Sequence, residues 1–338
     1  MMFCRNLSIL VGAGISLNRA LDILSKETEK EKLKRTILSI SESIRAGKPF
    51  SDSLEEFPAV FDELFTNMVR VGETGGNLEE VLRLLATHYE KENDLRGKVV
   101  GALVYPAVVV SVMLIIGALM MVFVIPKLTK IFEDMNATLP LTTQLIITIS
   151  NLMADYALFF LAGFVVLAYL MRRFSKTISG QRLFHRALLR APVFGTIIKK
   201  VNSARMSRIL SSLIEAGVPM VRSLEIASRT LTNYYFRTSL VEASQEVQKG
   251  KPLSETLTAY STVYPVLITQ MIQVGEESGK LSDILKKIAD FYEEEVASIT
   301  KNLASVIEPL LMVVIGGAVG FFAVSMIQPL YSLVSQVG

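Results

Sequence analysis

Long apolar stretches alternate along this chain with segments in which apolar residues recur at helical spacing. No charged residue occurs in 99–125, 152–171 contains only Asp155, and 303–338 contains only Glu308. A helix needs about 20 apolar residues to cross a bilayer, and helices buried in soluble proteins seldom stay uncharged over such lengths. We therefore predict transmembrane helices at 99–126, 152–171 and 303–329.

The segments between these stretches read as amphipathic helices. Leucines and isoleucines recur at intervals of three, four and seven, a pattern typical of helices with one apolar face. Such a stripe is formed by Leu7, Leu10, Leu17, Leu21 and Leu24, and another by Leu33, Ile37, Ile40 and Ile44. Breaks are expected near Gly14 and Gly47, because glycine readily ends helices. Few segments alternate with period two, so we expect no substantial sheet.

Local signals also predict particular helix ends. Ser51 is a plausible N-cap for a short helix, and a helix over 64–71 is expected to stop at Gly72. Asn77 is expected to cap the next helix, whose first turn is acidic. That helix can continue through Tyr89 into the first predicted span.

The chain repeats itself at a constant offset of 203 residues. The matches span more than a hundred positions without a gap, so each copy comprises a stretch of about 90 residues with the amphipathic pattern, followed by one span. The middle span lies between the copies and belongs to neither. The matching pairs are Ala13-Gly14 with Ala216-Gly217, Gly47-Lys48-Pro49 with Gly250-Lys251-Pro252, Val71-Gly72-Glu73 with Val274-Gly275-Glu276, Tyr89 with Tyr292, Pro106 with Pro309, and Pro126 with Pro329.

Charge predicts the orientation of these spans. The stretch 172–208 has ten Lys or Arg and no acid, whereas 127–154 has two Lys, one Glu and one Asp. Positive charge stays cytoplasmic, so the N-terminus and both copies are expected inside. Because the N-terminal stretch has an internal counterpart at 204–220, we expect no cleaved signal peptide. The predicted domains are helical repeat 1 (1–98), an extracytoplasmic loop (127–151), a basic segment with helical repeat 2 (172–302) and an extracytoplasmic tail (330–338), separated by the three spans.

Composition points away from catalysis and nucleic-acid binding. The net charge is only +3, and one cysteine and two histidines offer little material for a metal site. No Gly-x-x-x-x-Gly-Lys-Ser/Thr loop is present for a nucleotide phosphate. Within the spans only Asp155 and Glu308 could serve as catalytic acids, and they are expected near opposite faces of the bilayer. We therefore expect no enzyme activity and no cofactor.

Two groups of residues are candidates for function. The first is the repeated glycine–glutamate motif, which either contacts a partner or simply stops a helix and places a solvated or capping acid. The second lies just inside the spans, where an ionisable side chain is costly and tends to face a partner or water unless it reaches the interface. The candidates are Gly72, Glu73, Gly76, Gly275, Glu276 and Gly279 in the first group, and Tyr105, Pro106, Glu308 and Pro309 in the second.

The repeated blocks Val71-Gly72-Glu73-Thr74-Gly75-Gly76-Asn77-Leu78 and Val274-Gly275-Glu276-Glu277-Ser278-Gly279-Lys280-Leu281 resemble the duplicated signature of the type II secretion system F domain. Tyr105-Pro106, Glu308-Pro309, and Leu139-Pro140 followed by Thr143 are similar to that family as well. The resemblance covers residues 3 to 330. It implies an inner-membrane platform protein of a type IV pilus or type II secretion machine.

Such platforms contact a cytoplasmic hexameric ATPase and transmit its motion to pilins or pseudopilins. The resemblance therefore implies these partners, other inner-membrane assembly proteins, the lipid bilayer and self-association into a homo-oligomer. The basic segment 172–208 either fixes orientation alone or also contacts anionic lipid heads. A transporter or channel and a scaffold of another secretion apparatus are the alternatives. A pore would need polar residues on several spans, and the first offers only Tyr105 and Ser111.

Overall fold

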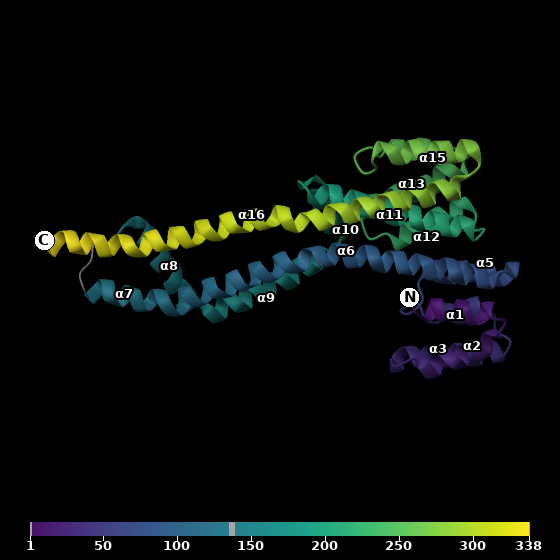
Figure 1. Ribbon diagram of the computed structural model, residues 1–338, viewed down its shortest axis with the longest axis horizontal. Helices are drawn as coiled ribbons and strands as arrows, with labels where there is room; N and C mark the ends of the chain where they lie inside the picture. Colours follow the sequence, from purple (N-terminus) through teal and green to yellow (C-terminus); the bar gives the residue numbers. More distant parts are fainter. Residues whose placement is uncertain (1, 135–138, 338) are drawn as a thin grey trace. The chain divides into compact units, whose positions relative to one another are not determined.

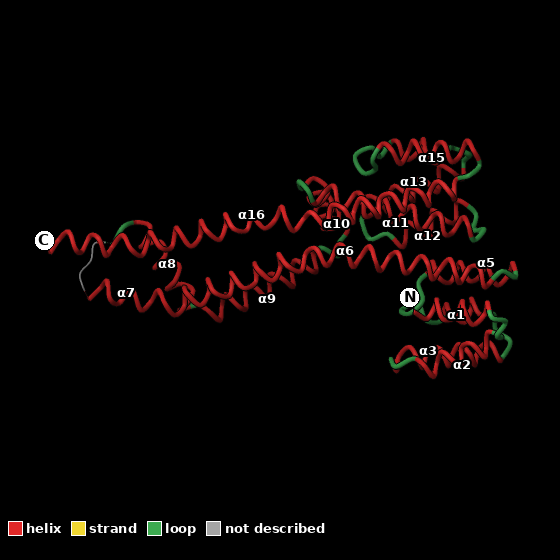
Figure 2. The backbone as a smooth tube through the Cα atoms, viewed as in Figure 1, coloured by secondary structure: helices red, strands yellow, loops and turns green. Residues whose placement is uncertain are grey.

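The computed structural model describes residues 2–134 and 139–337, and in these ranges the chain is helical without strands (Figures 1 and 2). The prediction of an all-α protein is confirmed. The helices are α1 (Met2–Gly12), α2 (Leu17–Glu27), α3 (Glu31–Arg45), α4 (Phe50–Glu55), α5 (Glu63–Gly75), α6 (Leu78–Leu119), the π-helix η1 (Met120–Val124), α7 (Ile125–Asp134), α8 (Leu141–Asp155), α9 (Ala157–Phe174), α10 (Ile178–Arg190), α11 (Phe194–Glu215), α12 (Met220–Thr230), α13 (Tyr234–Gln248), α14 (Leu253–Thr258), α15 (Val266–Ser278) and α16 (Leu281–Val337).

The chain divides into two compact units, each built from separate stretches. Unit 1 comprises Met1–Lys98 with Gln181–Ser298, and unit 2 comprises Val99–Gly180 with Ile299–Gly338. Unit 1 therefore contains the amphipathic stretches of both copies of the repeat. Helices α6 and α16 each contribute residues to both units.

Helix boundaries in unit 1 follow the internal repeat. Helices α2 to α5 and α12 to α15 begin and end at residues that differ by 203 in every case, and α6 and α16 begin 203 residues apart. Glycines with positive φ recur at the same offset, at Gly14 and Gly217, Gly47 and Gly250, and Gly76 and Gly279. Left-handed backbone favours glycine, so the breaks between helices are set by the same residue in both stretches.

Apolar stripes of neighbouring helices form the core of unit 1. Helix α2 buries Leu21 and Leu24 and packs against α3, which buries Ile37 and Ile40. Burying a side chain of this size contributes roughly 1.5–3 kcal/mol, which explains why short helices with weak intrinsic stability are retained. Helices α12 and α13 contact each other in the same way.

Ion pairs connect the two stretches within unit 1. Glu92 of α6 lies 2.6 Å from Arg205 of α11, and Lys91 lies 3.6 Å from Glu293 of α16. Glu293 also receives Arg208 at 2.8 Å, and both of these side chains are largely buried. Removing one partner of a buried ion pair leaves an uncompensated charge, so the pair strongly favours one arrangement of α11 against α16.

A second set of charges lies where α5 contacts α12. Glu63 accepts Arg222 at 3.3 Å and Arg229 at 3.0 Å, and Arg222 also donates to the Asn67 side chain. These pairs are partly exposed, so each contributes at most about 1 kcal/mol. Their role is to define which faces of α5 and α12 meet.

Unit 2 contains the apolar stretches. Two helical runs, Leu78–Phe132 and Leu281–Pro329, are long and apolar enough to cross a membrane by length and composition. They contain the predicted first and third spans. The predicted middle span, 152–171, starts at the end of α8, passes the non-helical Tyr156 and continues in α9, and it stays a prediction.

Two local predictions need correction. The N-cap of α4 is Pro49, and Ser51 lies inside the helix. Helix α5 does not stop at Gly72 but continues to Gly75 and ends on Gly76, because only the latter takes the left-handed conformation. The predicted extracytoplasmic segment 127–151 contains α7 and most of α8 in its described part, and its location stays a prediction. The expected continuation of α6 from the soluble stretch into the first apolar stretch is confirmed.

Candidate functional site

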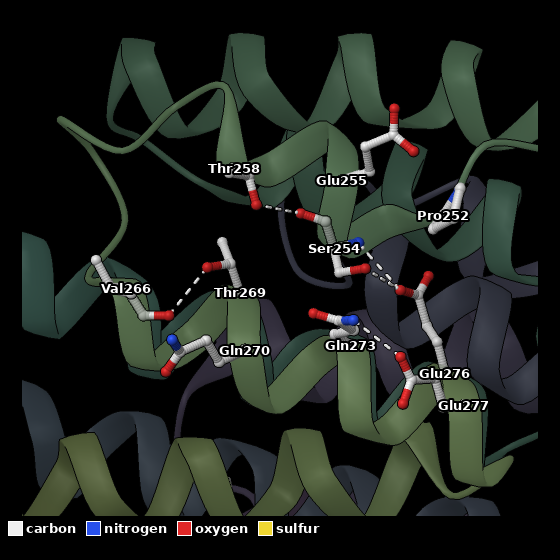
Figure 3. A pocket seen from close by; sticks show the side chains of 10 residues that line it. All are labelled: Pro252, Ser254, Glu255, Thr258, Val266, Thr269, Gln270, Gln273, Glu276 and Glu277. Carbon is white, nitrogen blue, oxygen red and sulfur yellow. Dashed lines mark hydrogen bonds between the residues drawn. The ribbon is translucent and has the colours of Figure 1, made fainter.

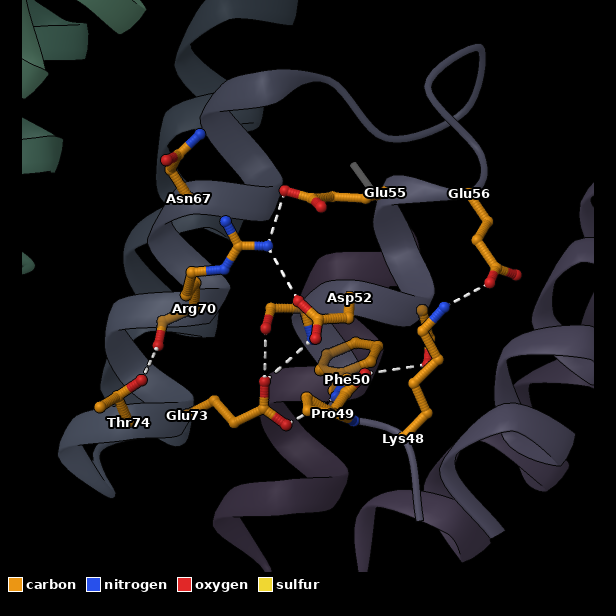
Figure 4. Close-up of polar contacts among 12 residues, drawn as sticks. Lys48, Pro49, Phe50, Asp52, Glu55, Glu56, Asn67, Arg70, Glu73 and Thr74 are labelled. Atoms are coloured by element: carbon orange, nitrogen blue, oxygen red, sulfur yellow. Dashed lines mark hydrogen bonds and ion pairs between the residues drawn. The ribbon is translucent and has the colours of Figure 1, made fainter. Parts of the chain in front are cut away.

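Glu73 caps the N-terminus of a helix that lies elsewhere in the sequence. Its carboxylate accepts hydrogen bonds from the Phe50 amide at 2.6 Å, the Ser51 amide at 3.0 Å and the Ser51 hydroxyl at 2.7 Å (Figure 4). The first amides of a helix have no partner within it, and Pro49 at the N-cap has no side chain able to accept them. A carboxylate from α5 therefore performs the capping, and its charge is favourable at the positive end of the α4 dipole.

Glu276 makes the same three bonds in the second stretch. The Leu253 amide donates to it at 2.6 Å. The Ser254 amide donates at 3.1 Å and the Ser254 hydroxyl at 2.5 Å (Figure 3). In each copy, the two residues that follow Gly-Lys-Pro therefore contact the glutamate of the Gly-Glu block, and the serine lies 22 residues before that glutamate.

The glycines of the motif permit a close approach and a tight turn. A Cβ at Gly72 would lie 2.9 Å from Val81 Cγ2, and one at Gly275 would lie 3.1 Å from the Leu281 Cα. Glycine therefore allows α5 and α15 to pass the first turn of the following helix. After Gly76, the Asn77 amide donates to the Gly72 carbonyl at 3.0 Å, which closes the end of α5.

A groove adjoins each capping carboxylate, and the two grooves differ in charge. The first groove lies between α4 and α5, and Arg70 crosses it to pair with Asp52 at 3.0 Å and Glu55 at 2.6 Å (Figure 4). The hydrogen bond to Glu55 raises the pKa of Arg70 above its ordinary value. The residues lining the first groove are Ile44, Gly47, Lys48, Pro49, Ser51, Asp52, Arg70, Glu73 and Thr74.

The second groove, between α14 and α15, has no cation among its lining residues in the described chain (Figure 3). Gln273 occupies the position equivalent to Arg70, and its amide donates to Glu277 at 2.8 Å. Glu255 stands where the first copy has Asp52. The lining residues are Pro252, Ser254, Glu255, Thr258, Val266, Thr269, Gln270, Gln273, Glu276 and Glu277. The second groove is therefore acidic and without a cation among its described lining residues, whereas in the first an arginine pairs with the acids.

The candidates near the apolar stretches are not brought into one site. Tyr105 is 50% exposed and Glu308 is also exposed, and no hydrogen bond joins the two among the residues described. Pro106 and Pro309 each lie inside a continuous helix. Across 2–134 and 139–337, no group of three His, Cys, Asp or Glu side chains is placed to hold a metal ion.

Sequence reasoning missed the partners of the glutamates. Ser51 and Ser254 lie two residues after the repeated Gly-Lys-Pro block, and their separation from the glutamate in the sequence hides the contact. Nothing in the sequence pointed to Arg70. Its equivalent in the second copy is Gln273, so this position is not among the matching residues of the repeat.

Replacing either capping glutamate should destabilise the protein. We expect Glu73→Ala or Glu276→Ala to cost about 2 kcal/mol, because each leaves two helix amides and a serine hydroxyl without their acceptor. The Gln variants should lose less, since an amide oxygen still accepts. The measurement is the apparent Tm of the full chain in detergent. Glu277→Ala is the control, and a drop as large as that of Glu276→Ala would contradict a capping role.

The amino-acid sequence is similar to those of known proteins. The sequence model of the type II secretion system (T2SS) protein F family matches residues 3–126 and, a second time, residues 206–329. Type IV pilus assembly protein PilC of Myxococcus xanthus is 34% identical over all of this chain and 81% of its own length. PilC of Thermus thermophilus is 35% identical over 99% of this chain and 82% of its own length. Type II secretion system protein F of Aeromonas hydrophila is 34% identical over 99% of this chain and 86% of its own length. The chain therefore belongs to the type II secretion system protein F family.

Proposed function

We propose that this chain is the inner-membrane platform of a type IV pilus or type II secretion machine, which couples a cytoplasmic hexameric ATPase to pilin or pseudopilin assembly. The relatives carry the names of both kinds of machine. The observation that carries the coupling is the continuity of α6 and α16, each of which runs unbroken from the charged residues of unit 1 into an apolar stretch. An unbroken helix transmits a displacement of one end to the other.

The second groove is the proposed contact for the ATPase. Its copy elsewhere in the chain already accommodates a guanidinium, which Asp52 and Glu55 bind. In the second groove Gln273 replaces that arginine and Thr258 replaces Glu55. Glu255 stands in place of Asp52, and Glu277, which accepts a hydrogen bond from Gln273, adds a second carboxylate for a basic side chain of a partner. The helices of the two copies have the same boundaries, but the charges of the two grooves differ. In the first groove the acids are paired with Arg70 of this chain, whereas in the second they can pair with a partner.

Filling the second groove should weaken ATPase binding. Gln273→Arg places a guanidinium beside Glu255, as Arg70 lies beside Asp52, and should raise the Kd for the ATPase about tenfold, equivalent to about 1.4 kcal/mol. Binding and ATPase stimulation are measured with the full chain in nanodiscs. Arg70→Gln, which opens the first groove, is the matched control and should leave the Kd unchanged. An unaltered Kd in Gln273→Arg, with an unaltered Tm, would exclude this groove.

We also propose that both stretches of the repeat are cytoplasmic and that 127–151 faces outward. Two spans then lie between the stretches, and the third follows the second stretch. The basic stretch 172–208 supports this orientation. Some of its charges also have partners inside unit 1, such as Arg205 with Glu92 and Arg208 with Glu293. Retaining these pairs requires unit 1 to stay on one side of the bilayer.

Labelling of introduced cysteines tests this topology. The native Cys4 is 4% exposed, and burial raises the pKa of its thiol to about 11, so it should contribute little background. We expect Lys130→Cys to react with an impermeant maleimide on whole cells, and Ala59→Cys and Ala259→Cys to react only after lysis. Equal labelling at all three positions on intact cells would refute the orientation.

Glu308 is proposed as a contact within the membrane machine. It lies exposed on α16 beside Pro309, at a depth where an unpaired charge is costly. Since Tyr105 does not bond to it, a group on a pilin or another assembly protein is the better candidate for its partner.

Substitution of Glu308 should separate function from insertion. Glu308→Ala removes a costly charge, so protein level should stay near normal while fibre assembly or secretion is lost. Glu308→Gln should keep part of the activity if hydrogen bonding is the role. Lys301→Ala, earlier on the same helix, is the control. Full activity of Glu308→Ala would leave Glu308 as an interfacial residue only.

A further inference from the structure

Two prolines at equivalent places in the repeat interrupt the backbone hydrogen bonds of unit 2. Pro329 lies inside α16, and its copy Pro126 lies in the first turn of α7, just after the π-helix η1. Proline carries no N–H, so one carbonyl on the preceding turn loses its donor. In a buried or apolar setting such a carbonyl costs free energy unless another group reaches it.

The helical pattern identifies the carbonyl in each case. In an α-helix, residue 329 would donate to residue 325, so Pro329 deprives the Ser325 carbonyl of its donor. In η1, the Ile125 amide donates to Met120, one residue further back than in an α-helix. The Met121 carbonyl would then depend on residue 126, which is Pro126.

Helix α8 donates to both carbonyls. The Thr143 hydroxyl donates to the Ser325 carbonyl at 2.5 Å, and the Ser150 hydroxyl donates to the Met121 carbonyl at 2.5 Å. Thr143 and Ser150 are seven residues apart, two helical turns, and therefore lie on the same face of α8. Both side chains are fully buried, at 0% exposure.

The contacts around these bonds are apolar. Ile146 of α8, Ile125, Phe132 and Met326 form a buried cluster, and Met121 and Phe322 pack against it. Water has little access to carbonyls in such a cluster, so the hydroxyls of α8 are their available donors. The cluster itself would hold α8 against α7 and α16, but it would not explain why hydroxyls occur at these two positions.

We propose that α8 joins the two repeat-related apolar helices by hydrogen bonds next to their prolines. Thr143 and Ser150 act as positioning residues, each of which replaces the hydrogen-bond donor that one proline removes. The helix that belongs to neither copy thereby links both copies at the same point of the repeat. This proposal concerns the architecture of unit 2 and holds whether or not the ATPase binds the second groove.

The test replaces each proline by alanine, which supplies the backbone N–H that the proline lacks. In the full chain in detergent, Thr143→Val should lower the apparent Tm by about 2–4 °C, whereas Thr143→Ser should not. Pro329→Ala supplies an amide to the Ser325 carbonyl, so Thr143→Val should have little effect in the Pro329→Ala background. Thr143→Val should keep its full effect in the Pro126→Ala background, which is the matched control.

Ser150 provides an independent second cycle. Ser150→Ala should lower the Tm in the natural background and in Pro329→Ala, but not in Pro126→Ala. This cycle decides the matter if Pro329→Ala fails to fold. An effect of Thr143→Val or Ser150→Ala that is the same in all three backgrounds would overturn the proposal, because the hydroxyl would then not act through the proline. Absence of any effect of the single variants would overturn it equally.

Discussion

Backbone polar groups that a helix cannot satisfy by itself constrain this protein at its most distinctive positions. A helix leaves its first amides without acceptors, and a proline leaves a carbonyl without a donor. In unit 1 the short helices α4 and α14 receive carboxylates from α5 and α15. In unit 2 the carbonyls of Met121 and Ser325 receive hydroxyls from α8. In each case a side chain from another element completes the hydrogen bonding, and this adds a specific contact between helices that apolar packing also holds together.

The capping carboxylate also explains the composition of the repeated motif. Glu73 must face α4, so α5 has to pass close to the start of α6, and only glycine at position 72 leaves room for Val81. Gly76 then turns the chain in a left-handed conformation that other residues adopt at a cost. The glycine–glutamate block therefore has a structural role, as a helix cap and a tight turn, and the two copies differ in the groove beside it. There the two copies have diverged, since Arg70 occupies one groove and Gln273 the other.

The two units contribute different parts of the proposed coupling. Unit 1 has ion pairs between its two stretches, from Glu92 to Arg205 and from Glu63 to Arg222, and these favour one arrangement of α5 and α6 against α11 and α12. In unit 2 the stretches meet through α8, which bonds to both repeat-related helices. Helices α6 and α16 each have residues in both units. A change in the contacts of these helices in one unit can therefore be transmitted along the helices to the other unit.

The helical class, the offset of 203 and the continuity of α6 into an apolar stretch can all be predicted from the order of the amino acids. These properties are local or repeated: the spacing of leucines reports a helical face, and a gapless match needs no knowledge of contacts. The pairs that the sequence does not predict are Glu73 with Ser51, Arg70 with Asp52, and Thr143 with the Ser325 carbonyl. These partners lie between 18 and 182 residues apart, and which of them meet depends on how the helices pack. The error at Ser51 has the same cause, because a local rule assigned it as a cap while the real cap came from another helix.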